Sequence, residues 1–196
     1  KIKVKNEEEE NEAKVGNSIV TTLDLELQQV ASDALGDNKG SVVAINPKTG
    51  EILAMVSKPS FDPNDLGAAL EAAYSGSDEE TPFINRAIDG LYPPGSVFKT
   101  VTLSSALENI PGVANRTFND KGKITFDDGT TLNNDAYQSH GAIDLRYAYR
   151  VSSNVVFGTF AMELGNSTLK QTAENYGFNS VISGPGLTIT ASQFPT

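Results

Sequence analysis

Hydrophobic and polar positions in the first part of the chain follow a helical pattern and then a strand-like one. Residues 23–34 place apolar side chains at helical spacing, and Gly36 is typical of a helix end. Two apolar runs follow at 41–46 and 51–57, and the Pro and Gly between them are typical of a β-hairpin turn. The β-branched segment 18–22, in front of the helix, reads as a short strand. The pattern therefore predicts a strand, a helix and a hairpin in that order.

The pattern of the remaining chain predicts shorter elements. Helical spacing indicates three further helices, at 68–74, 145–150 and 167–177. Strand-like runs at 123–126 and 130–132 flank a central Asp-Gly and predict a second hairpin. Loop composition prevails in three stretches: 58–63, 76–81 and 178–196. Strands and helices in this order indicate an α+β fold, with an antiparallel sheet on which helices pack.

The stretch 92–100, Tyr-Pro-Pro-Gly-Ser-Val-Phe-Lys-Thr, begins the most apolar predicted helix. The prolines and the glycine end what precedes them, so Ser96 is expected to be the helix N-cap. Lys99 is the one charged residue between Asp89 and Glu108. A helix that is apolar nearly all round is normally buried, and burial disfavours an ammonium group. We therefore expect a partly desolvated amine with a lowered pKa at Lys99.

Ser96 and Lys99 are three residues apart, so their side chains share one helix face. A hydroxyl beside an amine of lowered pKa is the arrangement that nucleophilic catalysis needs. The alternative is that Ser96 only caps the helix and that Lys99 extends along its stem to solvent. A second stretch has the same character, since small polar residues open an uncharged helix after 151. There, Ser152 or Ser153 could simply be an N-cap.

Composition limits the classes of function. The chain has 196 residues, of which 38% are hydrophobic and 20% charged, as in an ordinary globular domain. A net charge of −10 argues against nucleic acid as a partner. Without cysteine, and with His140 as the single histidine, we expect no metal site and no cofactor; His140 reads as a loop or packing residue. Residues 1–17 are expected to be an acidic linker and residues 18–196 the folded part.

Together the two polar helix starts resemble a known family. Ser-x-x-Lys at Ser96 and Lys99, followed by Ser-x-Asn at Ser152 and Asn154, is similar to the first two motifs of the active-site serine penicillin-recognising proteins. Four further segments match the phrasing of penicillin-binding proteins: 45–55, 85–87, 92–96 and 153–157. The resemblance covers about residues 20–178 and is to class B penicillin-binding proteins, which are monofunctional D,D-transpeptidases. It implies the serine β-lactamase/transpeptidase-like fold, including a helical subdomain.

The third motif of the family, Lys-Thr-Gly, is where this chain departs from the pattern. Lys48-Thr49-Gly50 has the right letters but lies before Ser96, in the predicted hairpin turn. In the family the functional Lys-Thr-Gly follows Ser-x-Asn and lies on a sheet strand that lines the cleft. We therefore interpret 48–50 as a false match. The chain is expected to be the N-terminal part of a transpeptidase domain, incomplete at its C-terminus and weak or inactive by itself.

The resemblance implies a role for each motif residue. Ser96 is the nucleophile that becomes the acyl-enzyme, and neutral Lys99 takes its proton. Ser152 relays that proton to the leaving amine, and Asn154 holds Lys99 and the substrate amide by hydrogen bonds. The backbone N–H of Ser96 supplies half of an oxyanion hole. These residues are the predicted catalytic set, with Asn154 as a substrate-binding residue.

The resemblance also implies partners and a place in the cell. The expected substrates are peptidoglycan stem peptides ending in D-Ala-D-Ala, and β-lactam antibiotics acylate the same serine. The full-length protein is expected to be membrane-anchored at the extracytoplasmic face of the bacterial cell membrane, with cell-wall synthesis proteins as partners. Two alternatives stay open: a β-lactam-sensing receptor domain, and a non-catalytic fragment without turnover. A β-lactamase is less favoured because no added glutamate motif for activating water is present.

Overall fold

The computed structural model describes residues 17–75, 81–184 and 186–195. The predicted linker up to residue 16 and most of the predicted turn at 76–81 lie outside the described residues. The chain divides into two compact units, Lys1–Ala87, called unit 1, and Ile88–Thr196, called unit 2. No helix of the described part is both long enough and apolar enough to cross a membrane.

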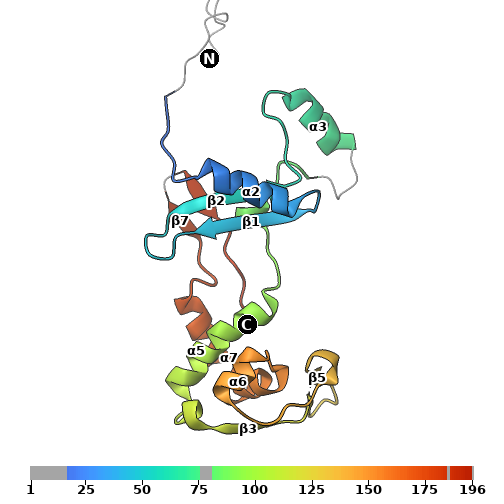
Figure 1. Cartoon of the computed structure of the whole chain (residues 1–196), viewed down its shortest axis with the longest axis vertical. Coiled ribbons are helices and arrows are strands. Elements are labelled where there is room, and N and C mark those ends of the chain that lie inside the picture. Colours follow the sequence, from blue (N-terminus) through green and yellow to red (C-terminus); the bar gives the residue numbers. More distant parts are fainter. Residues whose placement is uncertain (1–16, 76–80, 185, 196) are drawn as a thin grey trace, which may run out of the picture. The chain divides into compact units, whose positions relative to one another are not determined.

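Unit 1 is built on a helix and a hairpin, as the pattern predicted. Helix α2 (Leu25–Leu35) begins where the Asp24 carboxylate accepts a hydrogen bond from the Leu27 N–H, and it ends at Gly36. Strands β1 (Gly40–Ile45) and β2 (Ile52–Lys58) pair antiparallel, and α2 lies along this hairpin (Figure 1). The helix and hairpin enclose a small apolar core: Ala31, Ala54 and Val56, with Leu27, Leu35, Val42 and Ala44 against it.

The predicted strand at 18–22 is wrong, because this segment has no regular structure. Ile19 is 84% exposed and Val20 is 98% exposed. A β-branched sequence forms a strand only where a neighbouring strand accepts its backbone hydrogen bonds, and no strand of the described part pairs with it. Unit 1 also contains the predicted short helix, α3 (Leu66–Ser75), and the start of α4 (Arg86–Asp89).

Unit 2 holds its core between two helices that lie side by side, α5 (Lys99–Asn109) and α7 (Asn154–Asn175) (Figure 1). Phe157 and Phe160 of α7 meet edge to face, and Phe160 makes the same contact with Phe118. The other elements are short: η1 (Gly95–Phe98), η2 (Val113–Asn115), β3 (Thr117–Asp120), β4 (Lys123–Thr125), β5 (Thr131–Asn133), η3 (Asp135–Tyr137), β6 (Gly141–Asp144), α6 (Leu145–Arg150), β7 (Ile182–Gly184) and β8 (Leu187–Ile189).

Helix α7 is positioned by two features of its sequence. At Gly158 an added Cβ would lie 2.5 Å from the Leu132 side chain, so the absence of a side chain lets the β4–β5 hairpin approach the helix. At Gly165 the backbone leaves the helical region, with φ 72° and ψ 163°, which kinks the helix. The predicted separate helix from residue 167 is therefore the second part of α7.

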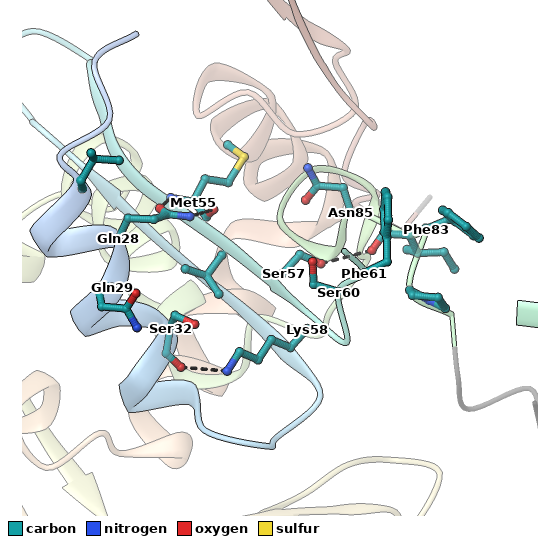
Figure 2. A pocket seen from close by; sticks show the side chains of 14 residues that line it. Gln28, Gln29, Ser32, Met55, Ser57, Lys58, Ser60, Phe61, Phe83 and Asn85 are labelled. Carbon is teal, nitrogen blue, oxygen red and sulfur yellow. Dashed lines mark hydrogen bonds between the residues drawn. The ribbon is translucent and has the colours of Figure 1, made fainter. Parts of the chain in front are cut away.

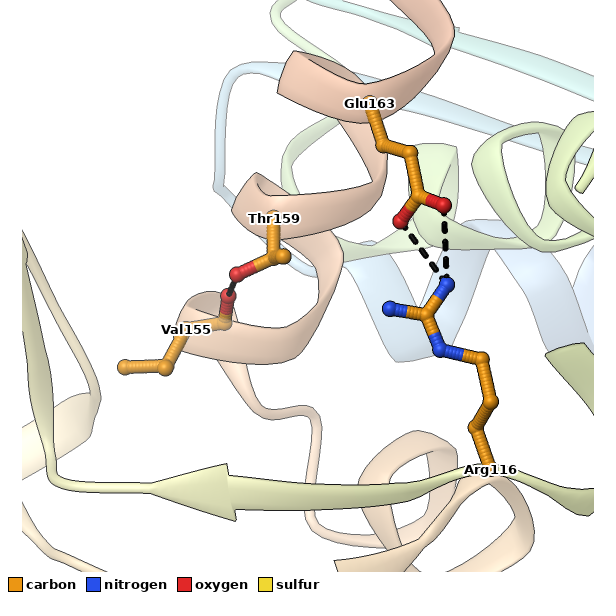
Figure 3. Close-up of polar contacts among 4 residues, drawn as sticks. All are labelled: Arg116, Val155, Thr159 and Glu163. Carbon is orange, nitrogen blue, oxygen red and sulfur yellow. Dashed lines mark hydrogen bonds and ion pairs between the residues drawn. The ribbon is translucent and has the colours of Figure 1, made fainter.

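The part of α7 before the kink also forms an ion pair with Arg116, the residue in front of strand β3. Arg116, just before β3, donates from Nη1 to both carboxylate oxygens of Glu163, at 2.9 and 2.8 Å (Figure 3). One turn earlier on the helix, the Thr159 hydroxyl donates to the Val155 carbonyl (Figure 3). Both partners of the ion pair are more than one third exposed, so the pair contributes at most about 1 kcal/mol to stability.

Two other predictions for unit 2 need correction, and one strand pair was not predicted. Helix α5 is not buried all round, since Leu107 is 51% exposed and its buried residues form one face. The β3–β6 pair has no counterpart in the predicted elements. The predicted loop 178–196 contains the β7–β8 hairpin. The strands of these pairs have only three or four residues, too few for an alternating pattern to be read from the sequence.

Candidate active site

Ser96 lies in the turn η1 and does not cap a helix, which corrects the N-cap prediction. The N-cap residue of this turn is Pro94, whose side chain makes no capping hydrogen bond. The Ser96 hydroxyl lies 3.1 Å from the Lys99 Nζ and 3.1 Å from the Ser152 Oγ. Within the described part of the chain no backbone N–H donates to this hydroxyl, so it is available for chemistry.

The Lys99 amine lies among four oxygen atoms and does not extend to solvent. Besides Ser96, its partners are the Ser152 carbonyl at 2.8 Å, the Ser152 Oγ at 2.7 Å and the Asn154 Oδ1 at 2.6 Å. All four partners are neutral groups. Burial disfavours the charged amine and lowers the pKa of Lys99, in the direction that the sequence predicted.

The four partners of Lys99 suit a neutral amine. The Ser152 carbonyl and the Asn154 Oδ1 can only accept hydrogen bonds, whereas the two hydroxyls can donate or accept. A neutral amine has two N–H bonds, one for each carbonyl, and its lone pair then points to the hydroxyl side. An ammonium has three hydrogens, which satisfy both carbonyls and one hydroxyl but leave no lone pair to take a proton. The four partners therefore accommodate the amine in either charge state, and only the neutral state has a lone pair that can take a proton.

Ser152 completes a triangle with Ser96 and Lys99. Its hydroxyl is 2.7 Å from the amine and 3.1 Å from the Ser96 Oγ. Its backbone has φ 56°, in the left-handed region that favours glycine. The residue follows α6, and its N–H donates to the Tyr149 carbonyl at 3.1 Å. A strained residue held by its surroundings is common at functional sites.

Ser153 and Asn154 divide capping and site contacts between them. Ser153 is the N-cap of α7, because its hydroxyl oxygen accepts a hydrogen bond from the Val156 N–H. Ser152 is therefore not needed as a cap. Asn154 is the first residue of α7; its Oδ1 accepts from Lys99, and its Nδ2 donates to the Asn133 carbonyl at 2.7 Å. The structure thus brings together all four residues that the sequence selected.

The remaining candidates lie in ordinary surroundings. Lys48 and Thr49 are exposed in the turn between β1 and β2, where the Lys48 N–H donates to the Asn46 side chain at 3.0 Å. His140 lies in the loop before β6, with its ring edge to face against Tyr147. Within the described ranges, no group of three or more His, Cys, Asp or Glu side chains could hold a metal ion.

Sequence reasoning missed two buried residues near residues 152–154, which are called the motif loop below. Asp120 and Asn134 are 0% and 6% exposed, and both bond to residues at the start of α7. Asp120 stands in the run Asn-Asp-Lys-Gly, whose letters read as a surface turn. No signal in the single sequence pointed to its burial.

Unit 1 contains a groove that lacks a catalytic set. It lies beside α2 and β2, and its lining includes Gln28, Ser57, Phe61 and Phe83 (Figure 2). Among the described residues of this lining, Lys58 is the one titratable side chain, and its Nζ donates to the Ser32 and Gly36 carbonyls at the end of α2. Its amine therefore caps the C-terminal end of α2.

Comparison with protein families assigns one description to most of the chain. Residues 40–192 match the penicillin binding protein transpeptidase domain. The peptidoglycan D,D-transpeptidase PbpA of Mycolicibacterium smegmatis is 36% identical to the chain over 181 residues. That match covers 84% of this chain and 36% of the relative, so the chain spans little more than a third of that protein.

Solved structures share the α+β fold, which confirms the predicted fold class. The D,D-transpeptidase domain of a peptidoglycan glycosyltransferase from Eggerthella lenta matches with TM-score 0.81 and 37% identity, over 89% of this chain and 41% of that one. The imipenem acyl-enzyme complex of penicillin-binding protein A from Mycobacterium tuberculosis gives 0.78 and 30%, over 87% and 42%. The complex of PBP2 with MreC from Helicobacter pylori gives 0.74 and 28%, over 81% and 30%.

Proposed function

The chain belongs to the penicillin-binding protein transpeptidase family, and we propose that the natural polypeptide containing it is a class B serine D,D-transpeptidase of peptidoglycan cross-linking. The observation that carries this proposal is the triangle of Ser96, Lys99 and Ser152, with sides of 3.1, 2.7 and 3.1 Å. A nucleophile, a base of lowered pKa and a second hydroxyl within hydrogen-bond reach are what acyl transfer requires.

Acylation starts at the Ser96 hydroxyl. Its Oγ attacks the carbonyl carbon of the penultimate D-alanine of a stem peptide, and its proton passes to the lone pair of neutral Lys99. The carbon–nitrogen bond to the terminal D-alanine then breaks. The proton moves from Lys99 through the Ser152 hydroxyl to the leaving amine, since Ser152 contacts both Lys99 and Ser96. The products are an ester on Ser96 and free D-alanine.

Hydrogen bonds to Asn154 and from the backbone support this step. Asn154 Oδ1 accepts a hydrogen bond from the amine, and Asn154 Nδ2 donates to the Asn133 carbonyl, which fixes the orientation of the amide. The Ser96 N–H lies in the first turn before α5, where backbone N–H groups lack helical partners, so it can donate to the developing oxyanion. A second donor is expected from a segment with the third family motif, which 48–50 does not supply.

A second stem peptide resolves the acyl-enzyme. Its amine attacks the ester carbonyl, Ser96 regains its proton through Lys99, and a new peptide cross-link forms. A β-lactam undergoes the same attack, its ring opens, and the ester remains on Ser96. The acyl-enzyme complex of the similar M. tuberculosis protein supports β-lactams as ligands of this site.

The wider setting follows from the same relatives. We place the natural polypeptide among cell-wall synthesis proteins, and the PBP2–MreC complex of H. pylori supports partners of this kind. The substrate proposed for the natural polypeptide, the peptidoglycan stem peptide, lies outside the cytoplasm. The site containing Ser96 is therefore expected to face the extracytoplasmic side of the membrane.

The test is release of D-alanine from a synthetic D-Ala-D-Ala pentapeptide, with and without an amine acceptor, using the natural polypeptide. We expect an acceptor-dependent cross-linked product together with D-alanine. Acylation by penicillin without any D-alanine release would contradict the proposal and favour a β-lactam-sensing receptor domain. Absence of both reactions would favour a non-catalytic role.

A further inference from the structure

Asp120, the last residue of β3, is a wholly buried carboxylate that the proposed chemistry does not use. Its side chain is 0% exposed. The carboxylate oxygens accept hydrogen bonds from the Ser153 hydroxyl at 2.7 Å, from the Gly122 N–H at 2.8 Å and from the Asn134 amide at 2.8 Å each. A buried anion is very unfavourable unless its lone pairs are satisfied, and these donors satisfy them.

The partners of Asp120 lead directly to the site. The Ser153 hydroxyl has one hydrogen, which it donates to Asp120, so its oxygen is left to accept from the Val156 N–H. Asn134 donates to Asp120 and accepts from the Val155 N–H at 3.1 Å through its Oδ1. The first turn of α7 is thus held twice to one carboxylate.

Ser153 lies between Ser152 and Asn154, two of the residues that contact Lys99. On one side Ser152 has a left-handed backbone, and on the other Asn154 points its Oδ1 at the amine. A left-handed non-glycine residue relaxes unless its neighbours fix it. Two of the contacts that fix this position are the hydrogen bond from the Ser153 hydroxyl to Asp120 and the one from the Ser153 N–H to the Ala148 carbonyl.

Asp120 is ionised, as a residue that holds the motif loop by accepting hydrogen bonds needs to be. Burial by itself would raise the pKa of Asp120. The hydrogen bonds from Ser153, Gly122 and Asn134, together with a weaker charge interaction with His140, outweigh burial and hold this pKa below the usual range of an aspartate. The carboxylate is therefore an acceptor only, so the direction of each hydrogen bond around it is fixed.

We propose that Asp120 is a positioning residue for acylation, which acts through Ser153 and Asn134 to hold Ser152 and Asn154 against Lys99. The inference rests on the proposed acyl transfer at Ser96. Without the carboxylate, the motif loop can move, and the hydrogen bonds that carry the proton between Ser96, Lys99 and Ser152 lengthen. The side chains that bind the substrate are unchanged. Misplacement of catalytic groups by about 1 Å can lower a rate roughly a hundredfold.

The experiment measures acylation of the natural polypeptide by a fluorescent penicillin over a range of concentrations. Asp120→Asn keeps the shape but removes the charge and one acceptor. We expect its limiting acylation rate to fall about tenfold to a hundredfold, with a half-saturating concentration changed less than about threefold. Ser153→Ala should fall similarly, Ser153→Thr should keep most of the rate, and Asp120→Asn/Ser153→Ala should be no slower than the slower single variant.

Thr172→Val is the matched control for stability. It removes another buried hydrogen bond of unit 2, from Thr172 to the Ser105 hydroxyl at 2.9 Å, without touching the loop. Its limiting rate per folded molecule should equal that of the parent. If Asp120→Asn does not fold, the comparison of Ser153→Ala with Ser153→Thr decides.

Three results overturn the inference in distinguishable ways. If the parent is acylated at Ser96 and Asp120→Asn has the same limiting rate as the parent, the positioning role is wrong and the proposed function stands. Where Asp120→Asn does not fold, a parental limiting rate in Ser153→Ala has the same meaning. If the parent is not acylated at all, the proposed function fails, and the inference fails with it. A rate loss that is additive in the double variant also contradicts the proposal, because Asp120 would then not act through Ser153.

Discussion

Replacing Ser152 by glycine and by alanine separates two properties that this residue combines. Its hydroxyl contacts Lys99 and Ser96 at 2.7 and 3.1 Å, and its backbone has φ 56°. Both substitutions remove the hydroxyl. Glycine also removes the backbone strain, whereas alanine keeps it.

The expected difference in stability follows from the backbone. A non-glycine residue in the left-handed region costs about 1 to 2 kcal/mol, and glycine loses roughly 0.4 to 1 kcal/mol through the greater freedom of the unfolded chain. The glycine variant should therefore be more stable than the alanine variant by about 1 kcal/mol. For a protein of this size, that is a difference of about 2 to 4 °C in Tm.

The assays are thermal unfolding followed by circular dichroism and acylation by fluorescent penicillin. Proton transfer by a positioned group contributes about 10² to 10⁴ in rate, so both variants should lose roughly a hundredfold or more in acylation. If glycine is no more stable than alanine, the strain at Ser152 is not real. If either variant is acylated at the parental rate, the hydroxyl does not relay the proton.

The other predictions concern two lysines. Lys99→Arg should be as inactive as Lys99→Ala in penicillin labelling, because a guanidinium stays protonated; an active arginine variant would make Lys99 structural. Since burial lowers the pKa of Lys99, acylation should rise with pH and level off below the range where exposed lysines titrate. Between the lowered pKa of Lys99 in the folded protein and the ordinary lysine pKa in the unfolded chain, the unfolded chain binds one proton more than the folded protein. The free energy of unfolding should therefore rise with pH in this range; urea titrations that show no such rise would contradict a lowered pKa. Lys48→Ala should leave the labelling rate unchanged. Residues 1–196 alone should label at least about a hundredfold more slowly than a polypeptide that also carries a Lys-Thr-Gly after Ser-x-Asn, because that segment is expected to supply the second oxyanion donor. Fast labelling of 1–196 that Lys48→Ala abolishes would refute both statements about the third motif.

The elements that could be predicted are those whose pattern is local. Helix α2 carries its own cap at Asp24 and its own end at Gly36, and the β1–β2 hairpin carries its turn residues. Strands β3 and β6 could not be predicted, because their pairing joins distant segments of four residues each. The segment 18–22 has the composition of a strand but no partner in the described part of the chain.

The candidate site was predictable for a related reason. The spacing of Ser96 and Lys99 within one turn is local, and the resemblance supplied Ser152 and Asn154. The sequence could not distinguish a capping serine from a catalytic one, because both stand at helix starts. Only the fold shows that Ser153 caps α7 while Ser152 turns to Lys99. Asp120 was invisible because its burial depends on contacts with Asn134 and Ser153.

The central claim is that Ser96 is the nucleophile, and its most direct test is the intact mass of the natural polypeptide after incubation with penicillin. We expect a mass increase of one penicilloyl group, located on the peptide containing Ser96 and absent from Ser96→Ala. Ser104→Ala, which changes a hydroxyl of α5 that contacts Tyr176, serves as the control and should be labelled fully. If a penicilloyl group persists in Ser96→Ala, Ser96 is not the nucleophile.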